Sequence, residues 1–378
     1  MARKAYGYTE RALAFLSECS NESILANVNM EQERELLYLA SVQARYTSAR
    51  DACELFYRDY TRRDPCDISV VGMDRNMDTP SSYLCISKMM DMELTEEDHR
   101  RYGEILHSTL AYLRRCPKSS FMYMKCITLF TNLLNYFREV PDAMTFDTFC
   151  MNAFAVMHPS TYVHSKMVAQ LSECMVRHLL EKRPELFANL PGCGSVDKVK
   201  QEADWIIGYT YHSALCHDIG KLFMIDTVAM YGRGLLDDEF SILKKHPVVG
   251  AMMAAEHPST KDFADVIECH HQWYDCSRGY PMKRDSRSSP YKTIIDIVTT
   301  ADCLDAATDT GGRSYKRGKD IEEFGEELRE TAGTRYAPFM AELFEDTAFK
   351  KDVGDILLNG RKRLYAEVYE KLKTEFGA

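Results

Sequence analysis

The segment His217-Asp218-Ile219-Gly220-Lys221 constrains this chain most, because it ends an apolar run with two residue types that bind metals. Neighbouring residues on an ideal helix point about 100° apart, so His217 and Asp218 cannot face one point from a regular helix. They can do so at a helix end where the backbone departs from regularity, and Gly220 permits such a departure. Lys221 brings a positive charge to the same place. Alone, the pair is also typical of an ordinary helix C-terminus with solvated side chains.

Further imidazoles and a carboxylate lie on both sides of this pair, in the same half of the chain. Asp302 lies in the segment Thr300-Ala301-Asp302-Cys303-Leu304-Asp305-Ala306, and six of the eleven histidines belong to the group. Each residue alone has an ordinary explanation, such as a buried core imidazole or an acid near a helix N-terminus. Together they supply metal-ligand types from five separate segments, which predicts a metal site. The six histidines are His164, His212, His217, His246, His270 and His271.

The order of these residues resembles the HD-GYP branch of the HD phosphohydrolase superfamily over about residues 155–345. This resemblance implies an all-α fold that holds two, sometimes three, metal ions. The motifs that carry it are His217-Asp218-Ile219-Gly220-Lys221, His246-Pro247 with Gly250, His270-His271, Gly279-Tyr280-Pro281, Ala301-Asp302 and Arg313-Ser314-Tyr315-Lys316.

Carried over residue by residue, the resemblance also implies roles. Asp218 is the position expected to bridge two metals, and Lys221 is expected to act beside them as a proton donor or a phosphate contact. Tyr280, Arg313 and Lys316 are expected to contact the substrate. The implied metal ligands are His164, His217, Asp218, His246, His270, His271 and Asp302.

A mixed His/Asp site suits first-row metals such as iron or manganese better than calcium or magnesium. Two such ions can share a bridging water and lower its pKa, which yields a hydroxide that attacks phosphorus. This chemistry predicts a dinuclear-metal phosphohydrolase, and the resemblance to the HD-GYP branch implies a cyclic dinucleotide such as cyclic di-GMP as its substrate. Two alternatives stay open: an HD phosphohydrolase of another nucleotide or phosphoester, and a non-catalytic, metal-containing signalling adaptor.

The chain departs from the family pattern His-His-Glu-x-x-Asp-Gly-x-Gly-Tyr-Pro in one loop. Gln272 stands in place of the glutamate, the first glycine is lost, and one residue is added before Gly279. An amide therefore replaces a carboxylate that could orient an imidazole, and the loop is expected to turn differently. Ser160 stands where some members carry a glutamate that helps to hold a third metal, so two metals are expected rather than three.

Charge is distributed unevenly along the chain. The whole chain has a formal charge of −10, which argues against broad contact with duplex nucleic acid. The segment from Arg278 to Lys319, however, contains nine Lys and Arg residues but only five Asp residues. A basic wall beside a metal centre fits an anionic phosphodiester, whereas for residues 283–289 a solvated basic loop is the preferred interpretation.

The length of 378 residues predicts about two domains. We expect a helical regulatory or interaction domain at residues 1–145, with a protein partner of its own, and a phosphohydrolase domain at 146–378. Helices are expected over 31–60, from Thr95 to Pro117, over 119–137 and over 355–376, the last packing on the phosphohydrolase domain or on a second subunit of a homodimer. Residues 63–82 read as a connection with a short strand at 68–71.

The composition points to a cytoplasmic protein. The chain has no apolar run near 18 residues and no apolar stretch after its N-terminus like that of a secretory signal. Its thirteen cysteines include no C-x-x-C pair, which is typical of buried thiols in a reducing compartment. We therefore expect neither a membrane span nor disulfides.

Overall fold

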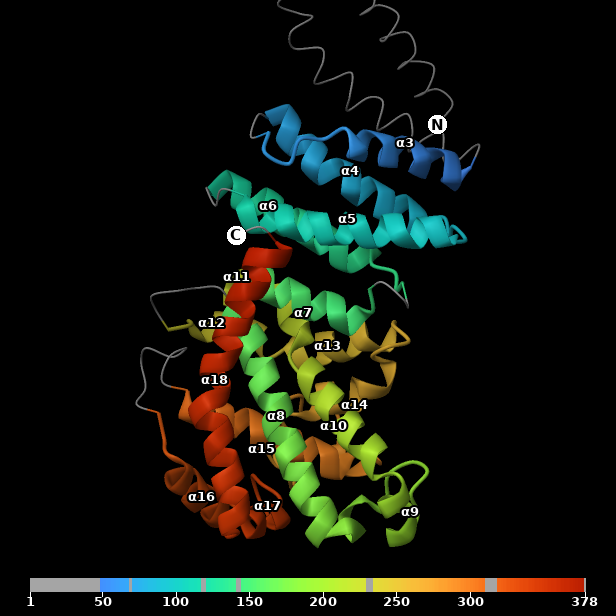
Figure 1. Ribbon diagram of the computed structural model, residues 1–378. Coiled ribbons are helices and arrows are strands. Elements are labelled where there is room, and N and C mark those ends of the chain that lie inside the picture. Colours follow the sequence, from blue (N-terminus) through green and yellow to red (C-terminus); the bar gives the residue numbers. More distant parts are fainter. Residues whose placement is uncertain are drawn as a thin grey trace, which may run out of the picture. The chain divides into compact units, whose positions relative to one another are not determined.

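Helices build both parts of the chain in the computed structural model, which describes residues 48–67, 70–116, 120–140, 144–228, 234–309 and 318–376 (Figure 1). The chain divides into two units, Met1–Met144 and Thr145–Ala378. Within the described ranges there is no strand, only three isolated bridges. The all-α prediction is therefore confirmed. None of the described helices is both long and apolar enough to cross a membrane.

The first unit contains α3 (Ala49–Thr61), α4 (Val70–Met89), α5 (Glu96–Arg115) and α6 (Ser120–Tyr136). Thr95 caps α5, and its side chain and that of Asp98 satisfy each other's backbone N–H groups. The apolar stripe predicted for this helix is buried, as its period of three to four residues requires. Its members are Ile105, Leu106, Thr109, Leu110 and Leu113.

The predicted connection over residues 63–82 is wrong for most of its length, because α4 begins at Val70 and runs through Pro80. A proline removes one backbone donor and disfavours a helix interior. Here α4 packs against α3 and α6, and buried Thr79 donates a hydrogen bond to Asp59 Oδ2 at 3.1 Å. Tertiary packing thus outweighs the local signal. Residues 68 and 69, and residues 31–47 of the first predicted helix, lie outside the described residues.

The second unit is organised around α8 (Pro159–Lys182), which packs against α7 (Phe146–Met157), α10 (Ala203–Cys216), α15 (Lys292–Thr308) and α18 (Thr347–Glu375). Figure 1 shows α18 running beside α8. The C-terminal helix therefore packs on this unit, as one of the two predicted alternatives. It begins earlier than predicted because Asp346 caps it by accepting from the N–H groups of Ala348 and Phe349.

Shorter elements complete this unit and carry much of the site. They are η1 (Pro184–Phe187), α9 (Val196–Gln201), η2 (Ile219–Met224), α11 (Ile225–Val228), α12 (Asp237–Leu243), α13 (His246–Ala255), η3 (Lys261–Phe263), α14 (Ala264–Cys269), η4 (Ser286–Ser288), α16 (Ile321–Glu330) and α17 (Pro338–Leu343).

Candidate metal centre

The His-Asp pair lies at a break between two helices. α10 ends at Cys216, and the 3-10 helix η2 begins at Ile219. The change of backbone at this break brings His217 Nε2 within 3.4 Å of Asp218 Oδ2, although the residues are neighbours. Both residues are fully buried. The predicted departure from regular helix is therefore present.

The structure gives Gly220 a different role from the one that its position in the sequence suggests. A Cβ atom at this position would lie 2.0 Å from the carbonyl oxygen of His246 and 2.6 Å from the nitrogen of Gly250. The glycine is needed because η2 and α13 touch backbone to backbone, and not because of a positive φ. This close approach brings the first residue of α13, His246, to the His-Asp pair.

All seven predicted ligands converge in this region, from α8, the break after α10, α13, the end of α14 and α15. Three overlapping groups have potential ligand atoms within 4.8 Å of one another. The groups are His246, His270 and His271; His164, His217 and Asp302; and His217, Asp218 and His270.

Asp218 lies at the centre of the cluster, and its two oxygens face different imidazoles. Its Oδ1 lies 3.1 Å from His246 Nε2 and 4.0 Å from His270 Nε2. Its Oδ2 lies 3.4 Å from His217 Nε2 and 3.6 Å from His164 Nε2. Asp302 takes a second central position, with Oδ1 3.1 Å from His164 Nε2 and Oδ2 3.5 Å from His271 Nδ1.

The hydrogen bonds of three histidines determine which ring nitrogen carries the proton. The Nδ1 atoms of His217, His246 and His270 each lie 2.7 Å from a backbone carbonyl oxygen three residues earlier. A carbonyl can only accept, so Nδ1 donates and Nε2 of the neutral ring carries a lone pair. These lone pairs point into the cluster.

Acceptors consequently face acceptors inside the cluster. His246 Nε2 lies 3.3 Å from His270 Nε2, and both atoms carry lone pairs. Within the described part of the chain, His217 Nε2 and Asp218 Oδ1 are buried without a hydrogen-bond partner. Burying such groups unpaired is costly, and a cation among them removes the cost. The donor set therefore fits a metal ion.

The pKa values favour the protonation states that metal ligands need. Burial lowers the pKa of His246, of His270 (far below its usual value) and of His271 (to about 3). Burial opposes ionisation of Asp218, but Lys221 and the imidazoles outweigh it and hold the pKa of Asp218 well below its usual value. The low pKa values of His246, His270 and His271 thus place neutral imidazoles beside an ionised carboxylate.

His164 behaves differently because it lies between two carboxylates. Burial lowers its pKa, but hydrogen bonds to Asp302 and Asp305 outweigh burial and raise the pKa to about 9. A proton on His164 therefore compensates the negative charge of Asp302 and Asp305, as a bound cation would. Binding of a cation would release this proton.

Asp305 and Arg361 support His164 and were not predicted as site residues. Asp305 Oδ2 accepts from His164 Nδ1 at 2.7 Å, and Arg361 Nη2 donates to Asp305 Oδ1 at 2.6 Å. A carboxylate behind a ligating histidine fixes its orientation. Asp305 could have been found from its spacing, because it follows Asp302 by three residues on one helix. Arg361 has no local signal, since it comes from the distant helix α18.

The predicted substrate contacts are only partly described. Lys221 Nζ donates to Asp218 Oδ2, so this lysine lies at the edge of the cluster. The ring of Tyr280 lies 4.6 Å from that of His271 and 6.3 Å from that of His246, measured between centroids. Arg313 and Lys316 lie outside the described residues.

Several cations of the basic stretch over residues 278–319 are paired with carboxylates. Arg284 pairs with Asp265 and Glu268, Lys292 with Asp296, and Lys319 with Glu327. The sequence count missed Asp265, Glu268 and Glu327, because these carboxylates lie outside the window in which charges were compared. These three cations are therefore paired, whereas Arg313, Lys316 and Arg317 of the same stretch lie outside the described residues.

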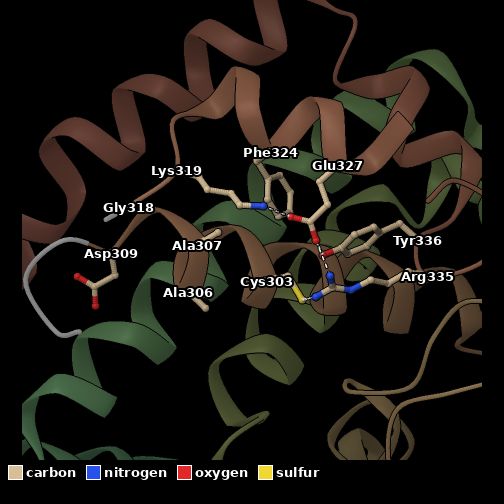
Figure 2. Close-up of a pocket in the computed structure, with 10 residues that line it drawn as sticks. All are labelled: Cys303, Ala306, Ala307, Asp309, Gly318, Lys319, Phe324, Glu327, Arg335 and Tyr336. Carbon is tan, nitrogen blue, oxygen red and sulfur yellow. Dashed lines mark hydrogen bonds and ion pairs between the residues drawn. The ribbon is translucent and has the colours of Figure 1, made fainter. Parts of the chain in front are cut away.

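One of these pairs lies in a cavity of about 290 Å³ against α15 (Figure 2). Lys319 Nζ donates to Glu327 Oε2 at 2.6 Å, and Arg335 contacts the other oxygen of the same carboxylate. Arg335 Nη2 also lies 3.7 Å from the sulfur of Cys303. One carboxylate thus pairs with two cations and holds the turn that contains Arg335 against α16.

Comparison with known proteins agrees with this picture. Residues 161–307 match the HD domain family. A cyclic di-GMP phosphodiesterase of Thermotoga maritima is 31% identical over 146 residues, which are 38% of each chain. A cyclic di-GMP phosphodiesterase of Vibrio cholerae is 29% identical over 141 residues, 35% of this chain and 28% of the relative. The 3'3'-cGAMP-specific phosphodiesterase 2 of Vibrio cholerae is 29% identical over 147 residues, 38% and 26% of the two chains.

The HD match lies in the same part of the chain as the His/Asp cluster. The chain spans less than two fifths of the length of each of these curated relatives. The matched HD segment contains His164, the His-Asp pair, Gly220 and Asp302. Residues 161–307 therefore form an HD domain, as the resemblance to the HD-GYP branch of the superfamily implied.

Proposed function

We propose that this protein is a metal-dependent phosphodiesterase that hydrolyses a cyclic dinucleotide, with cyclic di-GMP and 3'3'-cGAMP as the first candidates. The observation that carries the proposal is the convergence of unprotonated imidazole nitrogens on Asp218. His217, His246 and His270 all use Nδ1 for a backbone carbonyl and direct Nε2 at this carboxylate. The relatives named above add the substrate class.

We propose two ions in this site, with iron or manganese favoured by the mixed His/Asp donors. The two oxygens of Asp218 face different imidazoles, which supports a bridging role for this carboxylate. His246, His270 and His271 would hold one ion, and His164, His217 and Asp302 the other. When bound, the ions would lower the pKa of a water and neutralise charge on the phosphoryl group.

The chain's own residues would orient and screen the substrate. Lys221 is part-buried and paired with Asp218, so its ammonium group can reach a phosphate oxygen or the leaving oxygen at the edge of the cluster. Tyr280 packs on His271 and gives the site an aromatic wall on which a base can stack. Asp305 and Arg361 keep His164 in its orientation.

The decisive experiment measures turnover of cyclic di-GMP and 3'3'-cGAMP by protein purified without oxygen, with metal content determined on the same samples. Asp218→Ala should lose both metal and turnover, because it removes the central carboxylate. Asp355→Ala is the matched control, since it deletes an exposed carboxylate on α18 that pairs only with Lys351 among the contacts described. It should keep both.

The results separate the proposal from its alternatives. Hydrolysis of either dinucleotide that depends on Asp218 and on metal supports the proposal. Metal-loaded protein that cleaves neither dinucleotide, but does cleave another phosphoester, would refute the substrate class. Protein that binds a dinucleotide without cleaving it, with or without Asp218, would favour the signalling adaptor.

A further inference from the structure

The amide of Gln272 is enclosed by the loop that follows the two ligating histidines. Gln272 is only 4% exposed. Its Nε2 donates to the carbonyl oxygens of Pro281 and Arg284, the latter at 2.6 Å, and its Oε1 accepts from the N–H of Ser286 at 3.1 Å. Both amide hydrogens and the amide oxygen therefore have backbone partners.

This arrangement requires an amide and cannot accept a carboxylate of the same shape. Two of the partners are carbonyl oxygens, which only accept, and the third is an N–H group, which only donates. A glutamate would place a negative oxygen against the carbonyl oxygens of Pro281 and Arg284. Both carbonyl oxygens would then lose the hydrogen bond from residue 272 and would lie next to a buried negative charge, which destabilises the loop.

The backbone around Gln272 connects the amide to Tyr280. Gln272 and Gly279 form an antiparallel bridge, and the N–H of Tyr280 donates to His271 at 3.3 Å. A Cβ atom on Gly279 would lie 2.2 Å from the carbonyl oxygen of His271, so the two sides of the loop are in direct contact. A displacement of residue 272 would therefore reach Tyr280.

The same loop is also held by backbone hydrogen bonds to residues 334 and 335. The N–H of Tyr274 donates to Arg335 at 3.0 Å, and that of Asp275 donates to Thr334 at 3.1 Å. Cys276, at the position of the missing family glycine, takes the left-handed conformation with φ of +58°. Because Cys276 costs conformational energy here, the loop relies on contacts such as those of Gln272.

We propose that Gln272 is a positioning residue that holds Tyr280 against the metal centre, and that only an amide performs this role in this chain. The consequence is opposite to the one that the family pattern suggests. Restoring the family glutamate would release the loop and weaken substrate binding. The kinetic part of this inference rests on the proposed function, whereas the structural part does not.

The test compares Gln272→Glu with Gln201→Glu in the full-length, metal-loaded protein. Gln201 is exposed at the end of α9, so the control adds the same charge away from the loop. Trp205→Phe is introduced in all samples, because the chain has two tryptophans and Trp273 then reports the loop alone. Acrylamide quenching of Trp273, metal content, kcat and KM are measured for each variant.

Gln272→Glu should increase the quenching of Trp273 and raise KM about tenfold or more, since a buried hydrogen bond is worth that factor. Its kcat should change less and its metal content not at all, because under the proposed function the loop contacts a base of the substrate and not the reacting atoms. Gln201→Glu should resemble the parent. Gln272→Met replaces Gln272→Glu in the test if the glutamate variant does not fold. Methionine is similar in size to glutamine but has neither a charge nor a hydrogen-bond donor, so the same changes are expected.

Unchanged quenching and KM in Gln272→Glu would overturn the proposal. So would loss of metal from that variant, because the effect would then arise at His271. If the parent protein cleaves no cyclic dinucleotide, the proposed function fails, but the quenching of Trp273 still decides whether the amide holds the loop.

Discussion

Replacement of Gly220 by alanine tests how closely η2 and α13 must approach to build the site. The new Cβ would lie 2.0 Å from the carbonyl oxygen of His246, whereas ordinary van der Waals contact begins at 3.4 Å. The two segments would have to move apart by about 1.4 Å, the difference between these distances. Both contacts are with backbone, so no side-chain rotation can relieve them.

The magnitude follows from two opposing effects. Overpacking of this kind costs about 1–3 kcal/mol. Loss of glycine's freedom in the unfolded chain returns about 0.4–1 kcal/mol. We therefore expect the free energy of unfolding to fall by about 1 kcal/mol. Metal affinity should fall too, since the movement separates His246 Nε2 from Asp218 Oδ1, which now lie 3.1 Å apart.

Gly208→Ala is the matched control. Gly208 lies within α10, and a Cβ there would meet nothing within 4 Å. This variant should gain about 0.5–1 kcal/mol, because alanine is the better helix former. Urea unfolding followed by tryptophan fluorescence is a suitable assay, since both tryptophans, Trp205 and Trp273, belong to the unit Thr145–Ala378.

The reasoning is refuted if Gly220→Ala unfolds at the same urea concentration as Gly208→Ala and retains full metal. Loss of stability without loss of metal would refute the second part alone, since the strain would then be absorbed without moving His246.

Two further predictions concern charge. Asp305→Asn should lower metal affinity about 10- to 100-fold in competition with a chelator, since Asp305 orients His164. The control is Asp309→Asn, which removes a carboxylate that contacts Arg361 and should have a smaller effect. Equal metal affinities of the two variants would contradict the role of Asp305. Burial raises the pKa of Asp296 to about 7, although the positive charge of Lys292 opposes this shift. Between about pH 4 and 7 the folded protein therefore keeps a proton on Asp296, whereas the unfolded chain releases it. Stability should therefore fall as pH rises through this range by roughly 2–4 kcal/mol, and Asp296→Asn should lack this contribution; identical pH slopes of the urea midpoint would contradict it.

Much of the site could be predicted because its chemistry is carried by residue types and short spacings. The structure brings His164, Asp218 and the five other predicted ligands into one cluster, although their roles as ligands remain predictions. The helix with Thr95 at its start was also predictable, since a capping residue and a period of three to four residues are local signals.

Other features depended on contacts between distant segments and had no local signal. Pro80 suggested a break, yet packing against two helices keeps α4 continuous. The excess of basic residues over 278–319 suggested a basic wall, yet carboxylates from outside that window pair with two of them, Arg284 and Lys319.

The sequence by itself determined which side chains can bind metal and in what order they occur, because ligand chemistry is a property of the residue. Only the tertiary structure decided which ring nitrogen His164 presents, because Asp305, 141 residues away, binds its Nδ1. It also decided that Gly220 serves a close backbone contact, and that Arg361 from the last helix holds Asp305 behind His164. Such roles arise from distances between segments that a linear order of residues does not contain.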